Sequence, residues 1–471
     1  MRILFIYPDI SVHSGRFQQG IGSISSVLKK NGHKVSLLHL EKEMSKKKIL
    51  TEVESLSPDL VAFSCTTNQY PYVELCSKWI KEMFKIPIIC GGVHPTLSPE
   101  GVISDENIDM ICIGEGEYPM LELANRLETG EDPTSIKNLW VKAEGKLYKN
   151  SLRPLIANLD ELPFPDRDLF NYAAIIEKLS HKPNHPRIAE IMTGRGCPFN
   201  CTYCCNHALR RAYEDCGSYI RRRSVENVLD EIEYLTKRYK INRLYFDDDT
   251  FTMNPRWLED FCDKYSQRFS LPFSCNAFPT TLNENLVYQL KNAGCERIAV
   301  GIESGNEWLR RTVLRREVTN EQIIETFKLV NKAGIQSYSF NIIGLPFETP
   351  EMVEDTIKLN SQLAVDVIQV SVFYPYPKTD LYEICRQNGW LSQNEKISYF
   401  GESTTLNLPT LTKEQIAYYY RKMRSLSIAN MVRSTSPKAY VAYKLTKRLL
   451  GESLTDKTAV LAAKLLYRAD V

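Results

Sequence analysis

Three closely spaced cysteines carry the most distinctive chemistry in this sequence. Cys197, Cys201 and Cys204 stand in a C-x3-C-x2-C spacing within residues 194–206. Thiolates are soft ligands that suit zinc or iron–sulfur clusters. A zinc site needs four protein ligands, whereas three thiolates would leave one iron of a cubane cluster open. The spacing therefore favours an iron–sulfur cluster whose open iron binds a small molecule; a zinc knuckle is the alternative.

The setting of these cysteines, Gly-Cys-Pro-x-x-Cys-x-Tyr-Cys, resembles the radical S-adenosylmethionine (SAM) superfamily. The resemblance implies a 4Fe-4S cluster held by the three cysteines, with SAM chelated to its open iron. It also implies that Tyr203 packs beside the adenine of SAM. Cys205 has no place in the pattern, and we interpret it as a packing residue.

Alternating strand and helix patterns surround and follow the cysteines. They predict a partial (βα)6 TIM-like barrel over residues 187–400, because a closed barrel would need eight units. The helices are expected between six strands. Those strands are predicted at Ile188–Thr193, Arg243–Asp248, Phe273–Ala277, Arg297–Ile302, Ser337–Ile343 and Val367–Phe373.

Polar and glycine-rich motifs follow several of these strands, at the end where barrel enzymes place their sites. By the resemblance, Asp248 or Asp249 contacts the ammonium group of SAM. Glu303 and Ser304 resemble the Gly-x-Glu-Ser-Gly element that contacts its ribose and carboxylate, and Gly344 lets the backbone approach adenine. Residues 221–223, three consecutive arginines, are expected to form a solvated basic patch, with an anionic substrate group as the alternative partner.

Residues 1–140 show an earlier alternation of strands and helices, which predicts a Rossmann-like, doubly wound parallel sheet. No Gly-x-Gly-x-x-Gly follows the first strand, so a dinucleotide is not expected. The segment resembles the cobalamin-binding domain that precedes many radical SAM domains. Its histidine motif is absent, and we do not assign His13 as a cobalt ligand. The cobalamin contacts implied by the resemblance are Ser64, Thr66, Gly91, Gly92, His94, Gly114 and Glu115.

Two further regions lie outside these units. Residues 141–186 are expected to form a hairpin and a proline-containing linker. Residues 401–471 are expected to be a basic helical region, since residues 411–471 hold twelve Lys and Arg against four Asp and Glu. A segment such as Tyr440–Leu450 could rest on an anionic membrane, cover the barrel mouth or be solvated.

Composition narrows the class of protein. A formal net charge of +2 over 471 residues gives no case for nucleic-acid binding. The 13 cysteines are scattered through apolar segments, and no apolar run reaches the length of a membrane span. We therefore expect a cytoplasmic protein in a reducing compartment, with contact to a membrane surface left open.

The combined resemblance implies a cobalamin-dependent radical SAM enzyme with a 4Fe-4S cluster, SAM and cobalamin. It implies methylation of an unactivated carbon through a 5′-deoxyadenosyl radical and methylcobalamin, with no protein side chain assigned as catalytic. The alternatives are a non-methylating cyclase, ring-contraction or carbon–carbon coupling enzyme, a methylthiotransferase-like enzyme, and a cobalamin sensor. Expected partners are a small-molecule or lipid-like substrate and an electron donor such as flavodoxin or ferredoxin.

Overall fold

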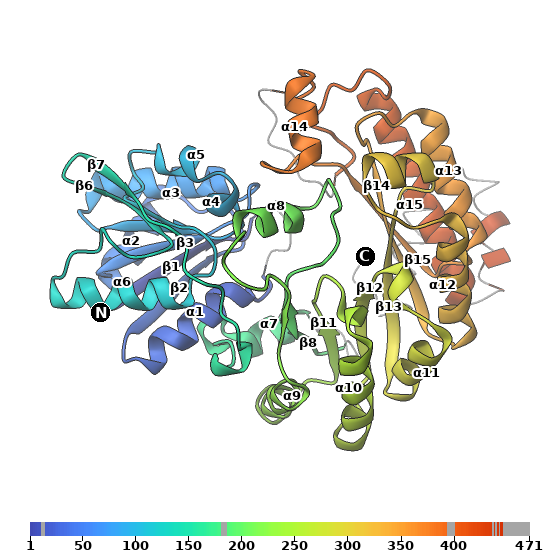
Figure 1. Ribbon diagram of the computed structural model, residues 1–471, viewed down its shortest axis with the longest axis horizontal. Helices are drawn as coiled ribbons and strands as arrows, with labels where there is room; N and C mark the ends of the chain where they lie inside the picture. Colours follow the sequence, from blue (N-terminus) through green and yellow to red (C-terminus); the bar gives the residue numbers. More distant parts are fainter. Residues whose placement is uncertain are drawn as a thin grey trace.

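The computed structural model describes residues 1–10, 15–179, 186–392, 401–435, 438, 440, 441 and 443–445. His13 and most of the predicted membrane-contact segment Tyr440–Leu450 lie outside these residues. Figure 1 shows one α/β unit on the left and a second on the right, with helix α8 (Cys205–Ala212) between them.

The first sheet has seven strands in the order β2-β1-β3-β4-β5-β6-β7. The first five strands in sequence run parallel, as predicted, and the apolar runs of the inner strands β1, β3, β4 and β5 are buried on both faces. The strands are β1 (Arg2–Pro8), β2 (Lys34–Leu40), β3 (Leu60–Ser64), β4 (Ile88–Gly91), β5 (Met110–Cys112), β6 (Leu139–Ala143) and β7 (Lys146–Lys149).

Helices cover both faces of this sheet. Apolar residues of α1 (Gln19–Lys30) and α6 (Glu117–Thr129) pack on one face. The other face is covered by α2 (Lys46–Leu56), α3 (Tyr70–Met83) and α5 (Pro99–Ile103). The short helix α4 (Val93–Leu97) follows β4 at the carboxyl end of the sheet. Helices on both faces make this a doubly wound sheet, in agreement with the prediction.

The hairpin formed by β6 and β7 departs from the sequence interpretation, which grouped it with the linker. Strand β6 pairs antiparallel with β5, so the hairpin extends the first sheet. Strand β7 lies at the edge of this sheet, which agrees with its exposed, lysine-containing sequence. The division into residues 1–140, 141–186, 187–400 and 401–471 otherwise stays a prediction.

The second sheet has six parallel strands in the order β15-β14-β13-β12-β11-β8, which confirms the six predicted strand–helix units. Strands β8 and β15 stand at opposite edges of the described sheet, so it is an open, partial barrel. The strands are β8 (Ile188–Ile191), β11 (Arg243–Phe246), β12 (Phe273–Ala277), β13 (Cys295–Glu303), β14 (Gln336–Ile343) and β15 (Val367–Val372).

Helices α9 to α13 follow the outer side of this sheet (Figure 1). A side chain just before each of these helices caps its first turn. Ser224 caps the first of them through a hydrogen bond from the backbone N of Asn227, and Thr319 and Gln322 form a capping box at α12. The helices are α9 (Val225–Tyr239), α10 (Pro255–Arg268), α11 (Glu284–Asn292), α12 (Asn320–Lys332) and α13 (Pro350–Gln362).

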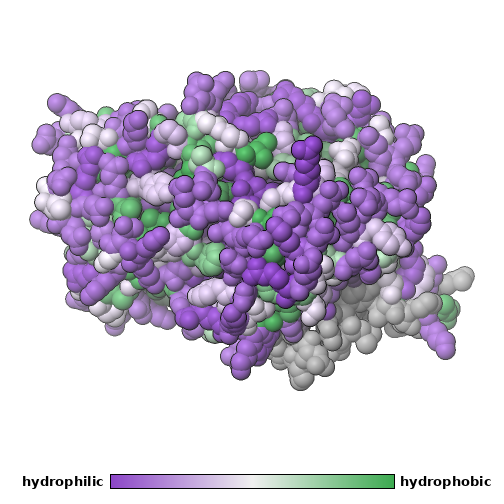
Figure 2. All heavy atoms as spheres, turned by 60° about the horizontal axis from the view of Figure 1, so that its bottom comes forward, coloured by the Kyte–Doolittle hydropathy of each residue, from purple (hydrophilic) through white to green (hydrophobic). Residues whose placement is uncertain are grey.

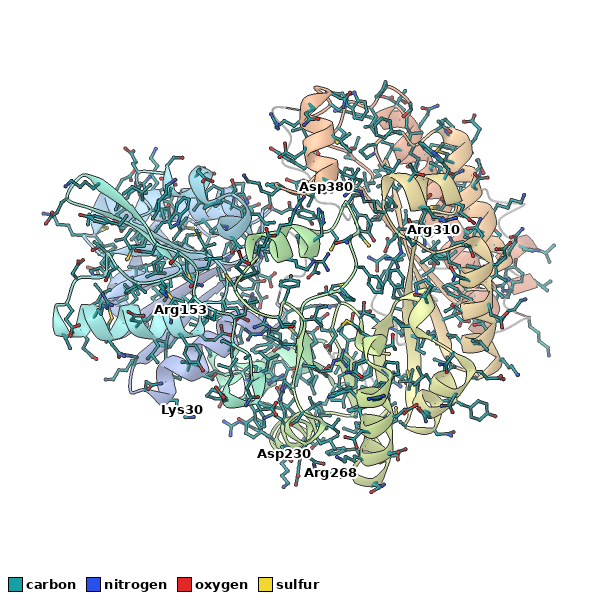
Figure 3. All side chains as sticks on the ribbon, viewed as in Figure 1. Lys30, Arg153, Asp230, Arg268, Arg310 and Asp380 are labelled. Carbon is teal, nitrogen blue, oxygen red and sulfur yellow. The ribbon has the colours of Figure 1, made fainter. Side chains whose placement is uncertain are left out.

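Outside the sheet, surface ion pairs link neighbouring helices. Asp230 of α9 and Arg268 of α10, both labelled in Figure 3, are joined at 3.0 Å. Because these pairs lie in solvent, they contribute little to stability. The barrel is held mainly by its continuous apolar layer between strands and helices.

The last described helix, α15 (Lys413–Thr435), packs along the edge strand β15. The hydroxyl of Ser427 accepts a hydrogen bond from the backbone N of Ile368 at 3.0 Å, which satisfies an edge donor. In the part of the chain that the structure describes, no helix has the length and apolarity needed to cross a bilayer. Figure 2 shows a face on which hydrophilic residues surround small, separate apolar groups.

Candidate active site between the two sheets

A cavity of 360 Å³ lies at the carboxyl ends of the first-sheet strands. Ligands of open α/β sheets bind at this end. The linker forms one wall of this cavity through Leu159, Leu162 and residues 163–165. Six residues predicted from the sequence also line it: Ser64, Thr66, Gly91, Gly92, Gly114 and Glu115.

At two of these positions, a positive φ and a close neighbouring atom require glycine. Gly92 has φ +100°, and a Cβ atom there would lie 2.7 Å from the carbonyl oxygen of Cys65. Gly114 has φ +87°, and its Cβ would lie 2.5 Å from the hydroxyl oxygen of Tyr213. Only glycine combines this backbone with such contacts. Tyr213 follows the cysteine motif in sequence, so the two units touch at Gly114.

His94 does not line the described part of this cavity. Its Nδ1 lies 3.2 Å from the hydroxyl of Thr67, and its ring packs on Tyr70 with 4.6 Å between centroids. Burial lowers the pKa of His94 to about 4. The imidazole is therefore neutral at physiological pH and packs under the loop that follows β4.

The three cysteines lie in the loop between the short strand β9 (Gly194–Arg195) and α8. Cys204 caps α8, and its sulfur accepts a hydrogen bond from the backbone N of Asn206 at 3.5 Å. Burial raises the pKa of the Cys197 thiol to about 11 and also raises that of Cys201. Among the described residues no three metal-binding side chains converge on one point. The donor set itself, three thiols of one loop, is that of an iron–sulfur ligand loop.

A buried cation lies against this loop. Arg316 is 6 % exposed, and its Nη1 lies 3.6 Å from the sulfur of Cys201. Its Nη2 donates to the carbonyl oxygen of Gly301 at 2.7 Å, and the guanidinium packs 4.1 Å over the ring of Phe278. Arg316 opposes the effect of burial on the pKa of Cys201 and so favours the thiolate.

Glu303 and Tyr203 meet beside this arginine. The hydroxyl of Tyr203 donates a hydrogen bond to the carboxylate of Glu303, whose pKa burial raises. Glu303 adopts φ +66°, a conformation that a non-glycine residue rarely takes. The next residue, Ser304, is fully buried, and Arg310 (labelled in Figure 3) donates to its carbonyl oxygen at 2.6 Å. The strained turn is thus held by surrounding contacts.

The three aspartates after β11 have different environments. Both carboxylate oxygens of Asp248 accept hydrogen bonds from Thr193, at 2.8 and 3.0 Å. Asp249 accepts from the side chain of Asn206, directly beside the cysteine loop. Asp247 has exposed surface, and desolvation together with the charge of Glu190 raises its pKa to about 7. Asp249 rather than Asp248 is therefore directed toward the cysteines.

Gly344 directly follows β14 and has φ +75°. Its backbone N donates to the carboxyl of Glu348 at 2.6 Å, and the backbone N of Leu345 donates to the same oxygen at 3.1 Å. Burial raises the pKa of Glu348 to about 8. A Cβ at Gly344 would lie 3.1 Å from the side chain of Ile416, so α15 reaches this turn.

Comparison with known proteins gives a consistent result. Residues 191–359 match the Radical SAM superfamily, and residues 17–124 match the B12 binding domain. An uncharacterized methyltransferase of Pyrococcus horikoshii is 30% identical over 407 residues, which cover 86% of each chain. The chain belongs to the cobalamin-binding radical SAM enzymes.

A further relative and a solved structure extend the comparison. The anaerobic magnesium-protoporphyrin IX monomethyl ester cyclase of Rubrivivax gelatinosus is 25% identical, covering 95% of this chain and 80% of its own. The structure of the radical SAM methyltransferase TsrM from Kitasatospora setae superposes with a TM-score of 0.67. It covers 90% of this chain and 83% of the TsrM chain at 18% identity, which shows the shared fold.

As a cobalamin-binding radical SAM enzyme, the protein has a 4Fe-4S cluster, SAM and cobalamin as cofactors. The cavity and the cysteine loop offer donor groups and space of the expected kinds. The three thiols suit iron, and the glycine-lined cavity suits a large flat ring that approaches the backbone.

Sequence reasoning missed several residues of this radical SAM site. The basic-patch interpretation of residues 221–223 is wrong, since Arg221 is 8 % exposed and Arg222 packs 4.5 Å over Trp257. Arg195 and Arg316 were not singled out at all. Arg195 directly precedes the cysteine motif, which is a signal that could have identified it. Arg316 lies 115 positions from its cysteine partner, and no local pattern connects the two.

Proposed function

We propose that this cobalamin-binding radical SAM enzyme methylates a carbon atom of a small molecule. One observation carries the proposal. The cavity lining runs from the first sheet to Gly194 and Arg195, and the cysteine motif begins two residues later at Cys197. A substrate at this junction would lie between both cofactor sites. Two of the three compared proteins are named methyltransferases, which supports the transfer of a methyl group.

We assign the cluster to Cys197, Cys201 and Cys204. Arg316 would offset the negative charge of the thiolates, because its guanidinium is buried within 3.6 Å of the Cys201 sulfur. Cys205 follows the motif as the first residue of α8 and is left out of the ligand set.

We assign SAM to the turns that surround the cysteine loop. Asp249 would accept a hydrogen bond from the ammonium group, and Tyr203 would pack beside adenine. Glu303 would contact the ribose side, while the fully buried Ser304 would shape the turn that Tyr203 and Arg310 hold. Gly344 would leave room for adenine at the end of β14. We assign Asp248 the role of holding Thr193 in place through hydrogen bonds.

We assign part of the corrin face of cobalamin to the 360 Å³ cavity, because the whole cofactor is several times larger than this volume. Gly92 and Gly114 would bring the backbone close to the corrin, and the linker wall would exclude water from one side. His94 is assigned to packing. Bound together, the three cofactors supply the radical that activates the substrate and the methyl group that is transferred. The protein's own task is placement and exclusion of solvent.

Polar side chains on the inner face of the partial barrel would favour a substrate that carries hydrogen-bonding groups. Tyr245 and Asn276 are hydrogen-bonded across β11 and β12 at 3.0–3.1 Å, and Tyr338 donates to Gln369 across β14 and β15 at 3.2 Å. These side chains alternate with the buried residues of their strands, so they face the interior. They offer exchangeable hydrogen-bond donors and acceptors to a substrate.

The test needs oxygen-free protein reconstituted with iron, sulfide and hydroxocobalamin. About one cobalt and four irons per chain are expected, together with S-adenosylhomocysteine and 5′-deoxyadenosine once a substrate is present. Replacing each motif cysteine with Ala should lower iron well below four, whereas Cys205→Ala should retain it. Protein that binds four irons but no cobalt would overturn the cobalamin assignment.

A second candidate is a non-methylating radical reaction such as cyclisation. It is favoured by the Rubrivivax cyclase, to which this chain is similar over 95% of its length. Formation of 5′-deoxyadenosine without any S-adenosylhomocysteine would select this candidate.

We further propose a flavodoxin or ferredoxin as the electron donor, because cluster reduction needs a one-electron carrier. Contact of the basic C-terminal residues with an anionic membrane surface stays a proposal from charge alone. Co-sedimentation with vesicles containing phosphatidylserine would test it, and unchanged sedimentation without vesicles serves as the control.

A further inference from the structure

Two carboxylates of the first unit and two arginines of the second form a compact ion network at the cavity wall. Arg195 donates to Glu115 and to Glu117, each at 2.6 Å. Arg221 donates to both oxygens of Glu115, at 2.9 and 3.0 Å. Ser23 of α1 completes the network with a 2.7 Å hydrogen bond to Glu117. The network therefore joins α1, the loop after β5 and the residues before the cysteine motif.

The network is enclosed except at Arg195, whose side chain is 27 % exposed. The side chain of Glu117 is 4 % exposed and that of Arg221 is 6 % exposed. The Arg195 guanidinium lowers the pKa of Glu117 against the effect of burial, so the carboxylate stays charged. Charge-assisted hydrogen bonds of this kind are stronger than neutral ones and fix geometry, especially where one arginine bridges two acceptors.

The backbone behind Arg195 is rigid in the direction of the cysteines. Arg195 pairs with Arg221 in the two-stranded ribbon of β9 and β10 (Arg221–Arg222). Gly196 has φ +88°, and a Cβ there would lie 2.3 Å from the carbonyl oxygen of Tyr219. The backbone that carries Arg195 therefore leads through a tightly packed Gly196 directly into Cys197.

Ser23, Glu115, Glu117 and Arg195 all line the cavity. We propose that Arg195 is a positioning residue that couples the cobalamin cavity to the cysteine loop, so that cobalamin binding and cluster assembly strengthen each other. The inference rests on the proposed placement of cobalamin in this cavity. An occupant of the cavity would hold Glu115 and Glu117 in place, and these carboxylates hold the ribbon before the cysteines. Coupling between two binding events is reciprocal, so either cofactor should favour the other.

The experiment compares hydroxocobalamin affinity in two forms of the full-length protein. One form carries the reconstituted cluster, and the other is the cluster-free variant with Cys197, Cys201 and Cys204 replaced by Ala. Anaerobic titration followed by the visible spectrum of the corrin gives both dissociation constants. We expect the cluster to tighten binding by about 5- to 50-fold, within the usual range of coupling energies.

Arg195→Met in both forms should reduce this ratio to less than about twofold, because the methionine keeps an apolar stem without the guanidinium. Arg195→Lys should restore only part of the ratio, since an ammonium group cannot bridge two carboxylates in the same way. The matched control is Arg211→Met on α8, whose side chain contacts Asp380 and Lys378 instead of the network. It should leave the ratio unchanged.

The outcomes separate the inference from the function on which it rests. No cobalamin binding by the wild-type protein would overturn the placement of cobalamin. Binding with equal affinity in the two wild-type forms, or an unchanged ratio in Arg195→Met, would overturn the coupling. A loss of affinity by the same factor in both forms would assign Arg195 a purely structural role and also overturn it.

Discussion

The guanidinium of Arg316 lies 3.6 Å from the sulfur of Cys201 and is buried with it. This pair brings a fixed positive charge to one thiolate of the proposed cluster. Since hydrogen bonds and charges near the sulfurs set the reduction potential of an iron–sulfur cluster, Arg316 should make the cluster easier to reduce.

Replacing Arg316 with Met should therefore shift the cluster potential to a more negative value. Anaerobic redox titration followed by electron paramagnetic resonance measures it. Arg311→Met is the control, because Arg311 pairs with Glu317 and Glu307 at the surface. An unchanged potential in Arg316→Met would show that the charge does not act on the cluster.

Glu231 makes buried contacts with two arginines, so we predict that replacing it strongly lowers the stability of the fold. Glu231 is 1 % exposed and pairs with Arg167 of the linker at 2.6 Å and with Arg223. Glu231→Gln leaves two buried cations without a counter-charge, so the free energy of unfolding should fall by about 3–5 kcal/mol. Chemical denaturation measures the change.

Its control lies two positions further along the same helix. Glu233 pairs with Lys237 and Arg268 in solvent, so Glu233→Gln should leave the denaturation midpoint nearly unchanged. If both variants behave alike, the linker is not held by the buried pair.

Glu348 predicts a pH dependence of stability. Burial raises its pKa from 4.5 to about 8, so between these values the folded state keeps a proton that the unfolded state releases. Stability should therefore fall as pH rises from about 4.5 to 8, by at most about 1.4 kcal/mol per pH unit from this group. Glu348→Gln keeps an acceptor for Gly344 and should flatten this slope. An identical slope in wild type and variant would contradict the prediction.

We predict that replacing Gly92 lowers both the stability of the fold and the affinity for cobalamin. Gly92→Ala forces a side chain into a left-handed backbone and against Cys65, so it should cost more than the roughly 1–2 kcal/mol of backbone strain alone. It should also weaken hydroxocobalamin binding. The control is Gly130, which also has a positive φ, of 73°, but where a Cβ would meet no atom within 4 Å. Gly130→Ala should therefore lower stability only through backbone strain and leave hydroxocobalamin binding intact.

Local patterns predicted most of the fold. The strands of both sheets alternate with helices, and in the second unit side-chain caps such as Ser224 at α9 mark where the helices begin. The hairpin after β5 was misplaced, because pairing between β5 and β6 depends on which edge is open, and no local sequence feature reports it.

The site was predictable where spacing alone defines it. The cysteine motif and the loop at Gly114 are short in sequence, so spacing and residue type are enough to name their members. The contacts of Arg316 with Cys201 and of Arg195 with Glu115 join residues 115 and 80 positions apart. The first pair follows from folding within the second unit and the second pair from contact between the two units, neither of which periodicity describes.

The linker wall of the cavity has a consequence for how the cofactor is loaded and retained. The segment Leu159–Pro165 closes one side of the cavity, and the following Arg167 is locked to Glu231. A corrin held there would be covered on that side by the strap, which Arg167 ties to the barrel. We therefore expect cobalamin to exchange slowly with solvent, at a rate set by local opening of the strap. Protein produced with cobalamin in the growth medium should retain it through purification better than protein supplemented afterwards.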